Sequence, residues 1–412
     1  MKDRIWRLPP CPPYDAEGME SWLSDMAAQG WKLEPDDFFF GIASFLKTDP
    51  APVRYRLEAS PKKVSAWDDD GGVPDREAWE LNTDCGWEYA GRRGQFFIYR
   101  TADPGIRELH TDPQVQALAV KAVEKRQLRG FLGLLAVLFL HWLLRAWKGF
   151  SLLVTAVWVG LPLMLLFVLL ILLPLGGFLA EVLYLGRLKR KLLAGSPPDR
   201  KKDWRRTGRR YYGVRAALLC CFILFVLLAL RLLNADLTGK DRMALEDYPG
   251  KPPFATVADL VEGEYTHSWK DTRYNYVFQW SNAFLSAGMR WVENASVRRP
   301  DGTSLNGNLN VTFYEARSEW LAKLLAAECH RSDRGRAGKR YERLALPDLG
   351  LDYAAAYRND LGFPAVVLRR GRTVLQAMFF QSGTDERLLP EEWVRIMADS
   401  LSRSPEEKGE ND

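Results

Sequence analysis

The stretch with the highest density of chemically active side chains is a basic run between Arg187 and Arg215. It holds twelve lysine and arginine residues against only two acidic ones, Asp199 and Asp203. The twelve are Arg187, Lys189, Arg190, Lys191, Arg200, Lys201, Lys202, Arg205, Arg206, Arg209, Arg210 and Arg215. Because long apolar segments flank this run, the nearest anionic counterpart is the inner leaflet of a membrane. No base-stacking pattern or nucleic-acid-binding fold accompanies the run, so we favour a lipid partner and predict no nucleic-acid partner.

A second group of cations lies in the short turn "RRGR". It brings Arg369, Arg370 and Arg372 together between two apolar runs typical of strands. Three guanidinium groups at one hairpin tip suggest that this turn binds an anionic ligand or a wall polymer. The alternative is a charged tip that only keeps the hairpin soluble.

Nucleophiles and metal ligands are sparse. The chain has five cysteines and four histidines, without a disulfide framework or the paired spacing of a zinc site. Cys329 and His330 are neighbours on an expected helix, where adjacent side chains point in different directions. We find no triad, paired carboxylates or phosphate loop. We therefore predict no catalytic residue, metal or cofactor, and an enzyme is not favoured.

The aromatic and acidic motifs of the N-terminal part have ordinary structural interpretations. Trp22, Trp31, Trp79 and Trp87 lie at helix and strand spacing, which favours core positions over a ligand pocket. The segment "WDDDGG", residues 67–72, lacks the alternating ligand spacing of a calcium loop and is predicted to be a turn. His110, in a polar connector, is given no special role.

Three apolar segments are long enough to cross a membrane, although the mean hydropathy of the whole chain is only −0.23. We place spans near residues 130–147, 151–174 and 216–233, with a possible bend at Pro162 in the second. His141 and Glu181 are ionisable groups in these stretches, for which a proton relay is the functional alternative to a position near the headgroups.

The distribution of charge predicts the topology. Basic residues precede the first span and fill the loop between the second and third spans, and basic loops stay cytosolic. The first two spans then form a hairpin with a short outer turn, in which Arg145 and Lys148 oppose this layout. No signal-peptide segment is found in the first forty residues. We expect the N-terminus in the cytosol and the C-terminal part outside.

The cytosolic head contains a repeated pattern. A helix with an apolar stripe ends at Gly30 and is followed by Trp31 on a strand; the same order returns at Gly86 and Trp87. The strand "VRYRLEA" alternates apolar and charged residues, as expected of a sheet with one buried face. We predict two α-β-β units that share one antiparallel sheet, with the helices on one face.

These motifs resemble a known family. The helix that ends in "MAAQGW", the repeated "GWEY" and the strand "FFIYR" ahead of a basic helix and membrane spans look like the domain-of-unknown-function 2812 family. The resemblance covers roughly residues 8–125 and extends to the arrangement of spans. It implies a bacterial membrane protein and implies no activity.

The region after the third span is predicted to be a second globular domain. Strands are expected at "YNYVFQW", "GMRWVENASVRR" and "NLNVTFYEA", then a helix from Ser318, then a strand, a hairpin and a final helix. Three strands and a helix, stated twice, suggest a duplication within an antiparallel α+β sandwich.

The predicted fold class is therefore α+β, with four regions along the chain. They are a cytosolic head at 1–125, a membrane region at 126–235 that includes the basic cytosolic loop 187–215, an extracytoplasmic domain at 236–404, and a disordered polar tail at 405–412.

Three functions fit this layout. The first is a non-catalytic sensor or adaptor of the bacterial plasma membrane that couples the envelope to a cytosolic or membrane protein partner. The alternatives are a membrane-anchored envelope enzyme or ligand-binding domain, and an accessory subunit of a transporter.

Overall fold

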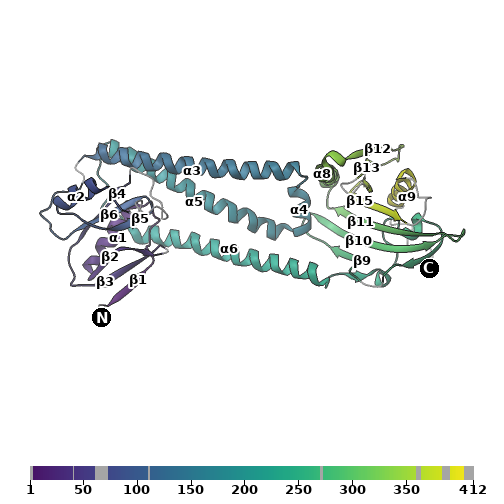
Figure 1. Cartoon of the computed structure of the whole chain (residues 1–412), viewed down its shortest axis with the longest axis horizontal. Coiled ribbons are helices and arrows are strands. Elements are labelled where there is room, and N and C mark those ends of the chain that lie inside the picture. Colours follow the sequence, from purple (N-terminus) through teal and green to yellow (C-terminus); the bar gives the residue numbers. More distant parts are fainter. Residues whose placement is uncertain are drawn as a thin grey trace. The chain divides into compact units, whose positions relative to one another are not determined.

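The computed structural model describes residues 3–39, 41–60, 73–109, 112–269, 272–358, 363–382 and 390–402. Figure 1 gives the order of the elements along the chain. Two compact units are present. Unit 1 comprises Met1–Leu138 and Val168–Ile223, and unit 2 comprises Phe139–Phe167 and Leu224–Asp412. The structure therefore has the mixed α+β character that the sequence predicts. The motif at 67–72, His110 and the tail at 405–412 lie outside the described residues.

The globular part of unit 1 is built from two small antiparallel sheets. Its elements are β1 (Arg4–Arg7), α1 (Ala16–Ala28), β2 (Trp31–Phe39), β3 (Ile42–Lys47), β4 (Arg54–Ala59), α2 (Arg76–Asp84), β5 (Glu88–Arg93) and β6 (Phe96–Thr101). The strand orders are β1-β3-β2 and β4-β6-β5. The expectation of one shared sheet is therefore wrong. One reason is that β2 is irregular: its pairing with β3 is interrupted between Leu33 and Phe38, and a disrupted ladder bends a strand and interrupts its pairing.

Glycine and tryptophan do mark the boundary between helix and strand twice. Gly30 and Gly86 have φ angles of 82° and 81°, which a residue with a Cβ adopts only at a cost. Trp22 and Trp87 are buried, as predicted, and Trp31 is half-buried. Trp79, in contrast, is 38% exposed, because α2 buries only Asn82 among its residues. The core interpretation is thus wrong for Trp79.

Three of the long helices are apolar enough to cross a membrane. They are α3 (Pro113–Trp147), α5 (Leu161–Leu193) and α6 (Trp204–Thr238). Their number agrees with the sequence-based prediction. All three extend beyond the predicted apolar cores, because polar residues continue each helix at one end or both.

The start of the second predicted span is wrong. Residues from Leu152 to Val159 form a separate helix, α4, which ends at Gly160 with a φ angle of 82°. The membrane-length helix α5 begins only at Leu161 and continues through Pro174 to Leu193. The physical reason is that α4 packs on unit 2, where Val157 is fully buried.

The N-terminal end of α3 and the C-terminal end of α5 belong to the core of unit 1. Ala117, Val120 and Val123 of α3 pack with Leu185, Leu188 and Leu192 of α5, and the same cluster includes Phe96 of β6. These helix ends are therefore fixed to the globular part by apolar burial.

Unit 2 is dominated by one antiparallel sheet of nine strands. Its strand order is β12-β13-β14-β15-β11-β10-β9-β7, with β8 paired to β10, and several of these strands are labelled in Figure 1. The strands are β7 (Met243–Ala244), β8 (Glu264–His267), β9 (Tyr276–Trp280), β10 (Leu285–Arg298), β11 (Ser304–Ala316), β12 (Glu342–Leu344), β13 (Tyr353–Arg358), β14 (Pro364–Arg370) and β15 (Thr373–Ser382). The helical elements are η1 (Leu245–Asp247), α7 (Val257–Leu260), α8 (Glu319–Ala337), η2 (Gly338–Arg340) and α9 (Pro390–Ser402).

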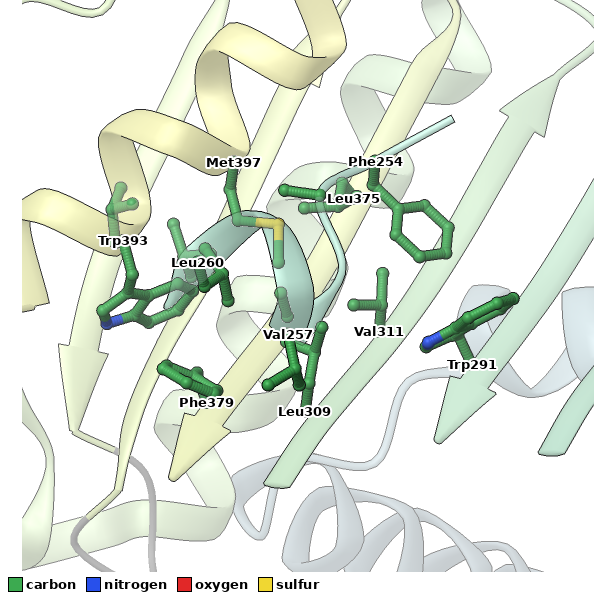
Figure 2. Close-up of a cluster of buried hydrophobic side chains, with 14 of the residues drawn as sticks. Phe254, Val257, Leu260, Trp291, Leu309, Val311, Leu375, Phe379, Trp393 and Met397 are labelled. Atoms are coloured by element: carbon green, nitrogen blue, oxygen red, sulfur yellow. The ribbon is translucent and has the colours of Figure 1, made fainter. Parts of the chain in front are cut away.

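Helices cover both faces of this sheet. Figure 2 shows one face, where Trp393 and Met397 of α9 and Leu260 of α7 meet Leu309 and Phe379 of the sheet. The opposite face packs against α4 and α8, through residues that alternate with the first set along β11, β14 and β15.

This arrangement does not support the expected duplication in the second domain. A two-fold rotation that relates neighbouring antiparallel strands has its axis perpendicular to the sheet and leaves each helix on its own face. Helices α8 and α9 instead lie on opposite faces.

Candidate functional site

A polar pocket lies on the α4/α8 face of the sheet in unit 2. Its volume is about 520 Å³. Helix α4 contributes Val154 and Trp158, and α8 contributes Asp333 and Arg336. The floor comes from strands β10, β11, β14 and β15, where the two helices leave part of the sheet uncovered. This pocket is called the sheet pocket below.

The floor of the sheet pocket carries a row of polar side chains across three strands. Arg290 of β10 is opposite Thr312 of β11, and Thr312 is opposite Gln376 of β15. Side chains at opposite positions point to the same face and lie about 5 Å apart. Arg290 is exposed and its guanidinium lies 5.7 Å from the ring centre of Trp158. Asn310, one row further along β11, also lines the pocket.

One wall of the sheet pocket contains a buried carboxylate, Asp333, whose oxygens already have hydrogen-bond and ion-pair partners. Asp333 accepts hydrogen bonds from the hydroxyl of Tyr357 and from Nε2 of Gln376, the latter at 2.6 Å, and forms an ion pair with Arg336. Burial and the adjacent Asp333 raise the pKa of the Tyr357 hydroxyl well above its usual range, so it remains a donor. The group fixes one turn of α8 onto the sheet.

A second hollow adjoins the first. Its volume is about 580 Å³, and it shares Val154 and Arg336 with the sheet pocket. It lies where α3 turns into α4, and its polar lining includes His141, Arg145 and Lys148. We call it the turn pocket. Within the part of the chain that the structure describes, no aspartate or glutamate lines it.

Both ends of the turn between α3 and α4 are fixed to α8. The hydroxyl of Ser332 donates to the backbone O of Gly149 at 2.5 Å, and Arg331 donates to the backbone O of Ala146 at 3.2 Å and of Phe150 at 3.0 Å. Gly149 has a φ angle of 84° and no room for a Cβ, because Ser332 O would lie 2.1 Å away. The turn and α8 therefore form one rigid edge of the turn pocket.

His330 has a structural environment. Its ring nitrogens lie 2.5 Å from the hydroxyl of Tyr353 and 2.7 Å from that of Tyr341, and its ring stacks on Tyr357. Burial lowers the pKa of His330 and raises that of the neighbouring Cys329 thiol. Burial therefore makes Cys329 a poor nucleophile.

The three arginines of the predicted ligand turn lie at the tip joining β14 to β15. Arg369 forms an ion pair with Asp352 at 3.3 Å, and Arg372 lies 3.9 Å from Glu315. Arg370 is exposed. None of the three lines the sheet pocket or the turn pocket. Ligand binding at this tip stays a prediction.

The basic run 187–215 is partly docked onto unit 1. Lys191 pairs with Glu17 at 2.7 Å, Lys202 with Asp15 at 2.7 Å, and Arg200 with Glu108 at 2.9 Å. Lys189 pairs with Glu124, and Arg205 lies 4.0 Å from Asp25. The carboxylates of α1 and its N-cap thus supply anionic partners that reasoning from the sequence did not anticipate.

The other seven basic residues of the run are exposed. Arg215 lies over the ring of Tyr211, 4.4 Å from its centre. The others are Arg187, Arg190, Lys201, Arg206, Arg209 and Arg210. These seven form no ion pair with a described residue. They are the part of the run that remains available to an anionic lipid surface.

A small cavity lies beside this docked region. Its volume is about 90 Å³, and its lining combines Glu20, Arg56 and Glu108 with apolar groups such as Phe96 and Leu188. Glu20 is buried, and its Oε2 accepts no hydrogen bond. Burial raises the pKa of Glu20 to about 7, against the opposing charge of Arg56.

The two polar groups noted in the apolar helices have local partners. Arg145 Nε donates to His141 Nε2 at 3.1 Å, and Gln127 Nε2 donates to Glu181 Oε1 at 2.7 Å. Among the described residues, no cluster of His, Cys, Asp and Glu could hold a metal ion, and the five cysteines are free.

The comparison with protein families identifies the N-terminal region. Residues 15–132 match the model of the family "Protein of unknown function (DUF2812)". The predicted resemblance is thereby confirmed, with a range that ends seven residues beyond the expected head. The DUF2812 match covers the globular part of unit 1 from the N-cap of α1 and continues into α3. No curated protein and no solved structure matches the chain.

Proposed function

We propose that this chain is a sensor or adaptor of the bacterial plasma membrane. In this proposal unit 1, with its DUF2812 region, lies in the cytosol, and the globular part of unit 2 lies outside. A change at unit 2 is passed to unit 1, which acts on a cytosolic partner. The segregation of basic residues along the sequence supports the sidedness.

The observation that carries the proposal is that α3 is packed at both ends. Its N-terminal residues Ala117, Val120 and Val123 are buried in unit 1. Its C-terminal end is fixed to α8 of unit 2 by Ser332 and Arg331. A single uninterrupted helix of 35 residues joins the two attachments. Coupling requires a continuous element whose equilibrium between two arrangements both sites bias, and we propose α3 as that element.

The coupling is testable without a known ligand. Gly149→Ala forces a Cβ against the backbone O of Ser332 and displaces the end of α3 from α8. Gly160→Ala is the matched control, since Gly160 has a similar φ angle but its nearest neighbour would be Pro162 Cδ at 3.8 Å. Hydrogen exchange of the full chain in nanodiscs reports both units.

We expect Gly149→Ala, and not Gly160→Ala, to change the exchange of amides in 113–129 and in α1. Amides of β11 serve as the check that unit 2 is still folded. The sensor proposal fails if three results coincide: β11 keeps its protection, the amides of the turn around residue 149 exchange differently, and the amides of unit 1 are unchanged.

The sheet pocket favours a second candidate, a membrane-anchored ligand-binding domain without transmission. That candidate predicts ligand binding to unit 2 with no response of unit 1. The exchange experiment therefore separates the two functions.

A further inference from the structure

We propose that the sheet pocket and the turn pocket together bind a phosphate ester, the phosphate of an anionic lipid headgroup or of a soluble organic phosphate. The inference names the ligand class for the sensor proposed above. Binding is measured without reference to unit 1, so the ligand class and the coupling fail separately.

The charge balance of the two pockets favours an anion. Arg290 lines the sheet pocket, Arg145 and Lys148 line the turn pocket, and Arg336 lines both. The one carboxylate in either lining, among the described residues, is Asp333. Since Asp333 is paired with Arg336 and hydrogen-bonded by Tyr357 and Gln376, it does not neutralise the other three cations.

Three of these cations have no carboxylate partner. Among the described residues, Arg145, Lys148 and Arg290 form no ion pair, and all three are exposed. Arg145 donates to Nε2 of His141, and Arg290 lies over Trp158. Exposed cations grouped around a hollow without a counter-charge raise the local concentration of anions.

The neutral donors fit a phosphate better than a smaller anion. The hydroxyl of Thr312 and the amides of Asn310 and Gln376 line the same floor as Arg290. The amide nitrogens of Asn310 and Gln376 each donate one hydrogen, to Asn308 and Asp333 respectively, and each keeps a second N–H. A phosphate ester offers several oxygens to such a set, whereas a carboxylate offers two. Apolar groups, among them Val154, Ala365 and Met378, complete the lining and suit the organic part of an ester.

The position of the turn pocket explains an oddity of the charge pattern. Arg145 and Lys148 lie in the turn that the proposed topology places outside, where the positive-inside rule disfavours them. Both line the turn pocket beside Leu144, at the end of the apolar helix α3. A binding role for these cations accounts for their retention on the outer side.

The test uses the full chain in phosphatidylcholine nanodiscs. The soluble arm titrates glycerol 3-phosphate by calorimetry, and the lipid arm replaces part of the phosphatidylcholine with phosphatidylglycerol and counts bound lipids by native mass spectrometry. We expect saturable binding in one arm. Soluble binding alone assigns a soluble ester, and retention of phosphatidylglycerol without soluble binding assigns a lipid headgroup.

Two pairs of variants locate the site. Lys148→Gln and Arg290→Gln should weaken binding about tenfold each, as the loss of a charge-assisted hydrogen bond implies. Lys323→Gln on α8 and Arg298→Gln on β10 remove the same charge from exposed positions outside both pockets and should leave binding unchanged.

The proposal is overturned if neither arm shows binding, or if the pocket variants and their controls weaken binding equally. Equal weakening would mean that the net charge of the protein, not these pockets, attracts the anion. The thermal unfolding midpoint of each variant shows that a loss of binding does not reflect unfolding.

Discussion

Glu20 is a buried residue of unit 1 whose charge is poorly compensated. Its Oε1 accepts a hydrogen bond from the backbone N–H of Leu57 at 2.9 Å, but Arg56 Nη1 lies 3.8 Å from its Oε2. Arg56 directs Nε and Nη2 to Glu108 instead, at 2.7 and 2.9 Å. Ionised Glu20 is therefore a buried carboxylate with a distant partner, which explains its raised pKa of about 7.

Glu20→Gln should change how the stability of unit 1 depends on pH. Because the folded-state pKa lies above the unfolded value of about 4.5, protonation of Glu20 stabilises the folded state. This contribution is complete below about pH 4.5 and is lost as pH rises through 7. We expect the wild type to lose on the order of 3 kcal/mol from this group between pH 4.5 and 8. The glutamine variant should lose none of it.

The measurement is thermal unfolding of the full chain in detergent from pH 5 to 8, followed by tryptophan fluorescence. Glu77→Gln, at an exposed position in the first turn of α2, is the control for removing a carboxylate. Parallel pH profiles for the wild type and Glu20→Gln would show that Glu20 is ionised in the folded state at all these pH values.

The residues of the two pockets show what a sequence hides at this scale. Arg369, Arg370 and Arg372 attract notice because they are contiguous. Arg290, Thr312 and Gln376 are far apart in the chain and meet only through the register of β10, β11 and β15. The available signal was the alternation of Asn306, Asn308, Asn310 and Thr312, which marks one polar face of a strand otherwise buried.

At the scale of elements, the start of α6 is held against the N-terminal segment of unit 1. Gly208 is buried, and a Cβ at this position would lie 3.1 Å from both Cβ and the backbone O of Pro10. Tyr212, one turn later, donates its hydroxyl to the backbone O of Leu8 at 2.8 Å. The absence of a side chain at Gly208 therefore lets α6 approach the segment that contains Leu8 and Pro10.

Gly208→Ala and Gly213→Ala should differ in sign. Alanine at an exposed helical position is worth up to about 1 kcal/mol relative to glycine, and no atom would lie within 4 Å of a Cβ at Gly213. Gly213→Ala should therefore stabilise unit 1 slightly. Gly208→Ala must displace Pro10 and should destabilise it by about 1–3 kcal/mol, as overpacking does. Hydrogen exchange of α6 and β1 measures both; a stabilising Gly208→Ala would show that the contact is loose.

The connector between α5 and α6 is the second element with a specific partner. Lys202 pairs with Asp15, the N-cap of α1, and the backbone N–H of Asp199 donates to Glu17 at 2.7 Å. The backbone O of Arg200 accepts from Ser21 at 3.0 Å, and Lys191 at the end of α5 adds an ion pair with Glu17. We expect Lys202→Gln to release part of the connector, because a charged hydrogen-bonded partner of buried Asp15 is lost, at about 2 kcal/mol.

Limited trypsin digestion reads this release directly, since the connector is rich in lysine and arginine. Cleavage in 196–206 should be faster for Lys202→Gln than for Lys201→Gln, whose side chain is exposed and unpaired among the described residues. Both variants remove one cleavage site, so their comparison isolates the ion pair. Equal cleavage rates would mean that Lys202 does not hold the connector.

The elements themselves were largely predictable, with an instructive exception. Apolar length located three membrane-capable helices, and Gly30 and Gly86 located two helix ends. Helix α4 was missed because "LLVTAVWV" is as apolar as a span, and only the packing of Val157 against unit 2 assigns it to the globular fold. The hydropathy of a segment indicates that it is buried, but not whether lipid or protein surrounds it.

At the scale of the whole molecule, the function proposed here depends on which side of the membrane each unit occupies. The seven exposed cations of 187–215 bear on this question, because moving each across an apolar bilayer is unfavourable. The five cations that lie beside carboxylates of unit 1 bear on it less, and least of all Lys189, Lys191 and Lys202, whose ion pairs are partly buried. The sequence alone could not make this division.

Labelling of single cysteines decides the sidedness. Cys85 is exposed in unit 1 and serves as the native probe; Cys220 and Cys221 of α6 are replaced by alanine, and Cys11 and Cys329 are buried. Ser304→Cys, at the exposed start of β11, reports unit 2.

In intact cells a membrane-impermeant maleimide should label Ser304→Cys and spare Cys85, and permeabilisation should expose Cys85. A Cys85→Ala chain gives the background. Equal labelling of the two positions in intact cells, whether both react or neither does, would place the two units on one side, and transmission across the membrane through α3 would then be impossible. Labelling of Cys85 alone would reverse the proposed sidedness.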